Sequence, residues 1–198
     1  SFPCTGGCLF NAGINSHREG CQDKLKAHWK LFCSLWRNLE KLCTLVGPFN
    51  LILEWPRTCT YWAQNRVRRL FKKLNLHLTD FDGCQFGLKP VTYEGNLEDA
   101  FLKKPWRFAT NVPEALVEFN QLCPGENEHH KHFTTNALNA KHSQSYTPYM
   151  TMFIHVVSYR FFKNGGINTS RTSIHDESRS HFGSNHPKAR KLTCLKRS

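Results

Sequence analysis

The sequence predicts an α/β fold in which helices and short strands alternate along the chain. Apolar residues recur every three or four positions over residues 21–46 and 64–74, as they do in helices with one buried face. Short apolar or alternating runs over residues 51–54 and 76–82 are soon followed by Pro or Gly, which is typical of strands. The order helix, strand, helix, strand, strand favours a mixed or parallel sheet with flanking helices.

The first helix and the first strand have the clearest patterns. The apolar stripe of the helix ends at Gly47-Pro48 and consists of Leu25, Trp29, Phe32, Trp36, Leu39 and Cys43. The apolar run 51–53 then leads into Glu54, which ends a predicted buried strand. Ligands of open α/β sheets bind just past the carboxyl ends of strands. Glu54 is therefore a candidate site residue, and the alternative is that it is simply the first solvated residue after the strand.

Three further elements are expected towards the C-terminus. A short strand is predicted within residues 103–111, and a short helix over 113–122 begins with a proline, which suits the first helical turn. Residues 147–163 predict a final helix, although their β-branched residues leave a strand as the alternative.

The composition changes at Asn164. From there on the chain has few apolar residues and more basic than acidic ones, which predicts a disordered basic tail over residues 164–198. We expect one α/β domain over residues 1–163. The chain starts at Ser1, inside what reads as a motif, so we expect a fragment or a truncated gene model that is incomplete at its N-terminus.

The charge and the cysteines indicate an intracellular protein with a polyanionic partner. The net charge of +12 and the pI of about 9.4 favour binding to nucleic acid, although a basic surface can also serve solubility alone. Nine cysteines, odd in number and irregularly spaced, predict a reducing compartment rather than a disulfide framework. We find no secretory signal and no apolar run of membrane-spanning length. The expected location is nuclear or cytoplasmic, away from membranes.

A basic helix face is the candidate nucleic-acid interface. The outward positions of helix 64–74 are Arg66, Arg68, Arg69, Lys72 and Lys73, and Lys104 joins them as a further candidate. Such a face could contact phosphates, and the alternative is a solvated face without a partner.

Histidines and a cysteine form a candidate zinc site within residues 123–132. Cys123, His129 and His132 are the predicted ligands, with His130 as a further donor, because thiolate and imidazole are the groups that zinc prefers. The spacing matches no standard zinc finger, so a histidine-rich loop without a metal is the alternative.

A third group of residues follows predicted strands and could form a catalytic site. Cys4 lies in a Gly-containing loop, Glu54 ends a strand, and Arg107 lies in the later segment 104–107. Brought together at one sheet edge, they would supply a nucleophile, a proton-transfer group and an anion-binding group.

These residues resemble motifs of the cytosine-5 DNA methyltransferase family. Pro3-Cys4 resembles its nucleophile loop, Leu53-Glu54-Trp55 its Glu–Asn–Val strand end, and Phe86-Gly87 followed by 104–107 its Gln–x–Arg–x–Arg segment. Residues 1–163 also resemble a group of uncharacterised methyltransferase-like proteins associated with eukaryotic mobile elements. The matching pieces there are Glu54, Pro56 and Trp62, residues 84–87, residues 104–107, and the Cys and His cluster.

The resemblance implies the second half of a Rossmann-like, S-adenosylmethionine-dependent methyltransferase. Cys4 would attack C6 of a cytosine rotated out of the duplex, and Glu54 would hold the base. Arg107 would orient Glu54 or the sugar–phosphate of the DNA. The chain carries Thr5 where the family has Gln, and it has no Asp–x–Phe–x–Gly–x–Gly loop for the cofactor. We therefore expect no activity from this chain alone. A nucleic-acid-binding module derived from a mobile element and a zinc-stabilised interaction domain are the two alternatives.

Overall fold

The computed structural model describes residues 2–8, 17–46, 49–91, 98–133 and 137–165. The chain divides into one compact unit over Ser1–Asn168 and a second over Thr169–Ser198. The second unit, and with it nearly all of the predicted basic tail, lies outside the described residues.

The described unit is a mixed α/β structure with two small sheets, as the sequence predicts in outline. The larger sheet has the order β1-β4-β2, formed by β1 (Ile52–Pro56), β4 (Pro105–Thr110) and β2 (His77–Asp82). In the smaller sheet, β3 (Ala100–Phe101) pairs in parallel with β5 (Lys131–His132).

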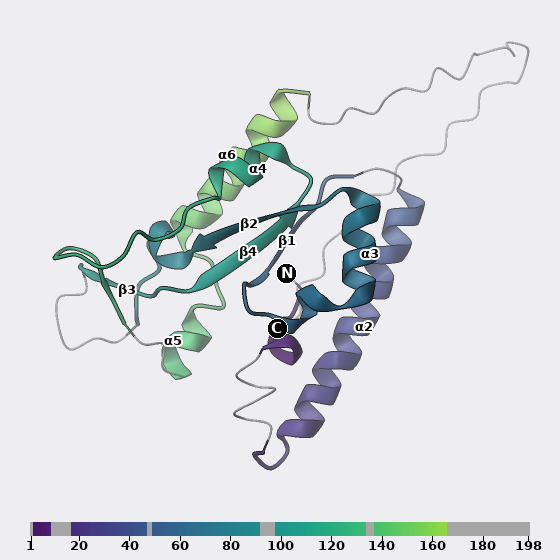
Figure 1. Cartoon of the computed structure of the whole chain (residues 1–198), viewed down its shortest axis with the longest axis horizontal. Helices are drawn as coiled ribbons and strands as arrows, with labels where there is room; N and C mark the ends of the chain where they lie inside the picture. Colours follow the sequence, from purple (N-terminus) through teal and green to yellow (C-terminus); the bar gives the residue numbers. More distant parts are fainter. Residues whose placement is uncertain (1, 9–16, 47–48, 92–97, 134–136, 166–198) are drawn as a thin grey trace, which may run out of the picture. The chain divides into compact units, whose positions relative to one another are not determined.

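Strand direction in the larger sheet differs from the expectation. Both β1 and β2 run antiparallel to β4, with Ile52 and His77 each opposite Thr110. β1 and β2 therefore point the same way, as strands joined by a helical crossover do, but β4 lies between them in the opposite direction (Figure 1).

Helices form where the periodic segments predict them. The α-helices are α2 (Cys21–Leu45), α3 (Asn65–Leu74), α4 (Pro113–Glu118), α5 (Ala137–His142) and α6 (Pro148–Lys163). Three short 3₁₀ turns are η1 (Thr5–Gly7), η2 (Thr60–Ala63) and η3 (Gly83–Phe86). The final segment is a helix rather than the alternative strand, and α5 is an addition that the sequence pattern does not indicate. Among the described residues, no helix has the length and apolar character needed to cross a membrane.

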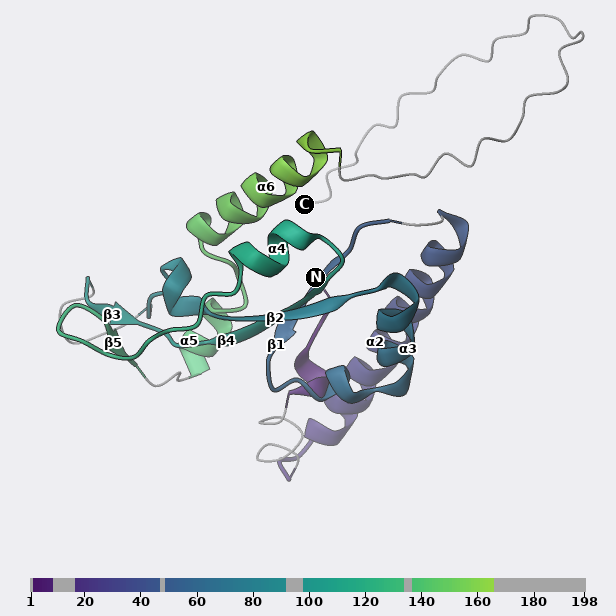
Figure 2. The same cartoon turned by 45° about the horizontal axis from the view of Figure 1, so that its top comes forward.

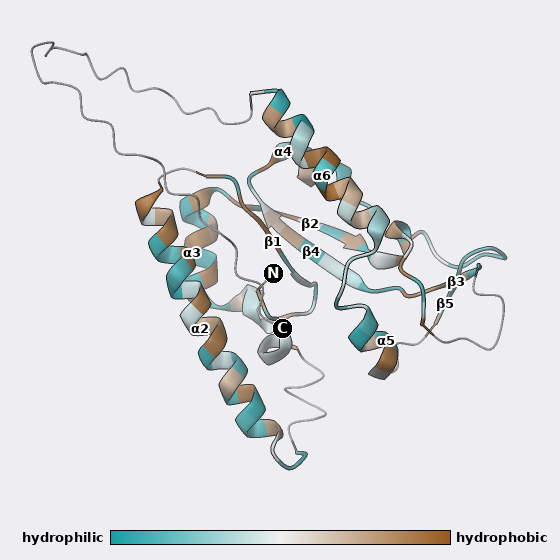
Figure 3. Cartoon of the chain, turned by 180° about the vertical axis from the view of Figure 1, so that it is seen from behind, coloured by the Kyte–Doolittle hydropathy of each residue, from teal (hydrophilic) through white to brown (hydrophobic). Residues whose placement is uncertain are grey.

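Two hydrophobic cores lie on opposite sides of the larger sheet, and side chains of β1 point alternately towards one and the other. Leu53 and Trp55 pack into a core with α2 and α3, which also contains Phe32, Trp36, Tyr61, Val67, Leu70 and Ala109. Figures 1 and 2 show α2 and α3 on one side of the sheet and α4 and α6 on the other. Figure 3 shows hydrophilic and hydrophobic residues alternating along α2, as expected for a helix with one buried face.

The second core lies between the sheet and the helices α4 and α6. Its buried members include Phe81, Phe86, Trp106, Phe108, Phe119, Met150, Val157 and Phe161. Phe81 packs against Phe108 and Phe119 with ring centroids 4.6 and 5.5 Å apart. This core fixes the end of β2 and the helix α4. Cys84 follows β2 in η3, and Cys123 lies in the segment after α4.

Candidate metal centre

Two cysteines and two histidines converge at the end of β2. One ligand atom from each of Cys84, Cys123, His130 and His132 lies within 4.8 Å of all the others. The Cys123 Sγ is 3.5 Å from His130 Nε2 and 3.3 Å from His132 Nε2, and the two Nε2 atoms are 3.0 Å apart. This group could hold a metal ion.

The three distances among Cys123, His130 and His132 fit three edges of a tetrahedral zinc site. With Zn–S bonds of about 2.3 Å and Zn–N bonds of about 2.0–2.1 Å, a tetrahedron has S···N edges of about 3.5 Å and an N···N edge of about 3.3 Å. The two S···N distances from Cys123 agree with these edges within about 0.2 Å, and the N···N distance within about 0.3 Å. The donor set of two sulfurs and two imidazoles is also one that zinc takes in structural sites.

Cys84 reaches the cluster because β2 ends in the η3 turn. The Gly83 N–H donates to Lys104 O at 2.8 Å, which ties this turn to the segment before β4. A Cβ at Gly83 would come within 2.8 Å of Leu88 and 2.9 Å of Trp106, so the close packing requires glycine there. The side chain of Cys84 is buried, with 3% of its surface exposed.

Cys123 is held in place by Asp82, the last residue of β2. Its backbone N–H donates to Asp82 Oδ2 at 3.0 Å, and the Gly125 N–H points at its Sγ at 3.4 Å. The other oxygen of this side chain, Asp82 Oδ1, is buried without a hydrogen-bond partner in the described part of the chain. A buried carboxyl group beside two thiols favours a bound cation, because the cation would offset its negative charge.

The two histidines come from one extended segment. Asn127 and His130 form an isolated antiparallel bridge, and Lys131–His132 is strand β5. The His130 ring stacks on Phe101 with centroids 4.4 Å apart, and the His132 N–H donates to Glu126 Oε1 at 2.6 Å. These contacts position the His130 ring and the His132 backbone.

Burial controls the protonation of two of the ligands. The pKa of the Cys84 thiol is raised to about 12, mainly by desolvation and also by the neighbouring Cys123 and Asp82. Desolvation and the positive charge of a protonated His132 lower the pKa of His130, whereas Glu126 opposes this shift. A neutral imidazole is the form that binds metals, so His130 is ready to coordinate at neutral pH.

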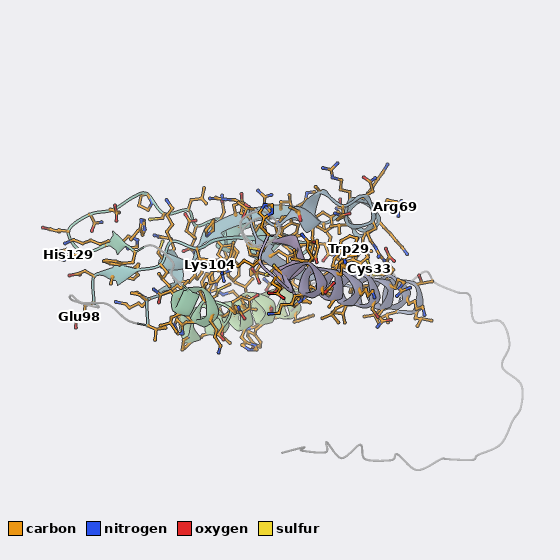
Figure 4. The ribbon with its side chains drawn as sticks, turned by 90° about the horizontal axis from the view of Figure 1, so that it is seen from below. Trp29, Cys33, Arg69, Glu98, Lys104 and His129 are labelled. Atoms are coloured by element: carbon orange, nitrogen blue, oxygen red, sulfur yellow. The ribbon has the colours of Figure 1, made fainter. Side chains whose placement is uncertain are left out.

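The cluster contains two of the three ligands that the sequence predicts. Cys123 and His132 belong to it. His129 is 79% exposed, and its ring nitrogens lie 3.7 Å from Asp99 and 3.4 Å from Glu128 instead. Figure 4 shows His129 and Arg69 in widely separated parts of the described unit.

Strand alternation distinguishes His130 from His129. Positions two apart in an extended segment share one side, so His130 and His132 point together while His129 points away. That signal is present in the sequence once a strand is assumed. Cys84 has no local signal, because it is distant from the other ligands along the chain and only the fold brings it near.

The predicted catalytic residues Cys4 and Glu54 do lie near each other. Burial raises the pKa of Cys4, the Glu54 charge raises it further, and Lys104 opposes the shift. The Tyr146 hydroxyl donates to Glu54 Oε2 at 2.9 Å. Burial is also the main cause that raises the pKa of Glu54.

Arg107, the third predicted catalytic residue, lies apart from this pair. Its Nε and Nη2 atoms donate to the two carboxylate oxygens of Asp80 at 2.6 and 2.8 Å across the β2–β4 ladder. The hydrogen bonds to Asp80 raise the pKa of Arg107. The cationic group near Glu54 and Cys4 is instead the ammonium of Lys104.

The predicted nucleic-acid contacts divide into two groups. Four basic residues of α3 are exposed, namely Arg68, Arg69, Lys72 and Lys73. Arg66 is half-buried and forms an ion pair with Glu40 at 3.0 Å. Lys104, labelled in Figure 4, is half-buried; its ammonium donates to the Ser143 carbonyl and lies 5.0 Å from the Trp106 ring.

Comparisons with known proteins leave the chain without an identified relative: no protein-family model, curated protein or solved structure matches it.

Proposed function

We propose that this chain is a zinc-stabilised α/β domain that binds nucleic acid through a basic face of α3. The convergence of Cys84, Cys123, His130 and His132 carries the zinc part of the proposal. In this proposal, protein side chains would fill all four tetrahedral positions of the zinc ion. Structural zinc sites have this arrangement, whereas catalytic zinc sites keep one position for water or substrate.

The zinc ion would connect three segments that are separate in the sequence. Cys84 lies in η3, Cys123 follows α4, and the two histidines lie in and beside β5. The β3–β5 sheet has only two residue pairs, and such short two-stranded sheets are marginal by themselves. Metal binding therefore supplies free energy of folding to this part of the domain.

Metal analysis with two neighbouring variants tests the zinc site. Protein purified without added zinc is expected to contain one zinc per chain, as measured by inductively coupled plasma mass spectrometry. His130→Ala removes a ligand and is expected to lose most of the metal. His129→Ala is the matched control, because His129 lies outside the cluster, and it is expected to keep the metal. A ratio near zero in the wild-type protein would exclude the zinc site.

The exposed basic residues of α3 support the nucleic-acid part of the proposal. Arg68, Arg69, Lys72 and Lys73 have no ion-pair partner within the described residues. Unneutralised cations on one helix attract phosphates and release the counterions that surround a nucleic acid. The net charge of +12 acts in the same direction.

A methyltransferase-like fragment is a second candidate, and the proximity of Cys4 to Glu54 favours it. The β1–α3–β2 crossover joins two strands of the same direction, which a partial Rossmann-like sheet would also contain. S-adenosylmethionine would supply the methyl group to cytosine in this case. Two features act against catalysis by the chain alone: the raised pKa keeps the Cys4 thiol protonated, and Arg107 is engaged by Asp80.

Radiolabelled methyl transfer to cytosine-containing DNA distinguishes the two candidates. The zinc-stabilised binding domain predicts no transfer by this chain. A signal that disappears in Cys4→Ser would instead establish the methyltransferase-like function.

A further inference from the structure

A largely apolar pocket of about 460 Å³ lies beside strand β1. Its walls include Leu35 of α2, Ile52 of β1, Phe108 of β4 and Ile154 of α6. A volume of this size falls in the range of small-molecule sites. The pocket shares no residue with the proposed zinc site or with the basic face of α3.

One carboxyl group is the main polar feature of this pocket. Glu54 and Tyr146 both line it, and the Tyr146 hydroxyl occupies only one oxygen of the carboxyl group, Oε2. The other oxygen, Oε1, is buried and has no hydrogen-bond partner in the described part of the chain. Leaving such an acceptor unpaired in an apolar pocket is unfavourable, so a ligand that donates a hydrogen bond to it would remove that cost.

The neighbouring cation does not satisfy Glu54. Lys104 is close enough to affect the pKa of Glu54, but no ion pair joins the two within the described residues. The Lys104 ammonium donates to the Ser143 carbonyl and lies over Trp106 instead. Glu54 Oε1 therefore remains as a hydrogen-bond acceptor for a donor group of a ligand in the pocket.

We propose that this pocket binds a small primary amine with an apolar body, whose ammonium group donates to Glu54 Oε1. The apolar walls would cover the hydrocarbon or aromatic part of the ligand, and the carboxylate would select the cation. Tyr146 supports this arrangement because its hydroxyl holds the carboxyl group in place. A carboxylate ligand is excluded by repulsion from Glu54, and a neutral ligand forms the weaker hydrogen bond.

Three probes of matched shape test the charge selectivity: 4-phenylbutylamine, 4-phenylbutanol and 4-phenylbutanoate. Isothermal titration calorimetry of the full zinc-containing chain is expected to give one site for the amine. The alcohol should bind at least tenfold more weakly, and the carboxylate should not bind measurably. Equal affinities for the amine and the alcohol, or no binding of the amine at millimolar concentration, would overturn the proposal.

Variants assign the binding to the pocket. Glu54→Gln keeps the shape of the side chain, and it should weaken amine binding at least tenfold while alcohol binding changes little. Leu35→Trp fills the pocket from α2 and should abolish binding of both ligands. Asp23→Asn, at an exposed carboxylate of the same helix, is the control and should change neither. Amine binding that survives Glu54→Gln or Leu35→Trp would place the ligand elsewhere and contradict the proposal.

Discussion

The Glu54 carboxyl group lines the pocket, and one of its oxygens is buried without a hydrogen-bond partner among the described residues. Burial raises its pKa, whereas the hydrogen bond from Tyr146 and the charge of Lys104 oppose the shift. The folded state therefore favours the protonated form more than the unfolded state does.

This shift predicts how stability depends on pH. Because the pKa is raised on folding, Glu54 contributes most below its ordinary pKa of 4.5, and this contribution is lost as the pH rises through the folded-state pKa. Glu54→Gln cannot titrate, so the stability difference between wild type and Glu54→Gln should fall with rising pH and then level off. Urea unfolding of both proteins between about pH 4 and pH 8 measures it.

The two proteins share every other titrating group, including Lys104, Tyr146 and Cys4, which face Glu54. Protonation of the metal ligands at low pH affects both and cancels in the difference. A difference that stays constant over the whole range would contradict the account of Glu54.

The residues of the proposed zinc site show what the sequence indicates and what it does not. The preference of zinc for thiolate and imidazole points to Cys123 and His132, and both belong to the cluster. The choice between His129 and His130 depends on the extended conformation of residues 130–132, which their composition does not reveal. Cys84 depends on how β2 and α4 pack, so no pattern along the chain could find it.

At the level of elements, α6 begins at a capping residue that also contacts the η3 turn, which carries Cys84. Thr147 Oγ1 accepts from the Met150 N–H at 3.0 Å and lies 2.6 Å from the Phe86 carbonyl oxygen, to which its hydroxyl donates. Thr147→Ala removes both bonds and should lower the free energy of unfolding by about 1–2 kcal/mol. Chemical denaturation measures the loss, and Thr151→Ala, exposed on the same helix, should change it by less than about 0.5 kcal/mol. Equal effects of the two changes would show that the cap is unimportant.

The basic face of α3 predicts a defined salt dependence. If Arg69 and Lys73 each contact one phosphate, replacing both with Gln should reduce the slope of log K against log salt by about 2 for duplex DNA. Fluorescence anisotropy with a labelled duplex at several salt concentrations measures this slope. Lys131→Gln with Lys141→Gln removes the same charge from β5 and α5 and should change the slope less. Identical slopes for the two double variants would contradict an interface on α3.

Elements were predictable where one face is buried. The stripe of Phe32 and Trp36 identifies α2, and Val67 with Leu70 identifies α3, because each packs against the same core. The short helix α5 has no such stripe. The direction of β4 was not predictable either, because antiparallel pairing on both sides depends on partners that are distant in sequence.

In the described unit as a whole, both hydrophobic cores pack against the larger sheet, and the proposed metal centre lies beside the second core. Phe86 and Leu88, both fully buried, belong to that core and pack at the η3 turn, which carries Cys84. Loss of zinc would free η3 and the β3–β5 pair together, and it would therefore weaken more than the site itself.

Removal of zinc should lower the thermal stability of the chain. A zinc chelator is expected to reduce the midpoint of unfolding by at least about 10 °C, since several kcal/mol are lost and each corresponds to about 2–4 °C in a chain of this size. Differential scanning calorimetry with and without chelator measures the change. Cys84→Ser should unfold at the lower temperature with or without chelator, and His129→Ala should respond like the wild type. If the chelator does not change the midpoint temperature of wild-type unfolding, the metal does not stabilise the fold.

The central claim, that zinc is bound by two sulfurs and two imidazoles, is tested most directly by X-ray absorption spectroscopy at the zinc edge. The arrangement of Cys84, Cys123, His130 and His132 predicts two sulfur neighbours at about 2.3 Å and two nitrogen neighbours at about 2.0–2.1 Å. Spectra with only oxygen and nitrogen neighbours, or with four sulfurs, would contradict it.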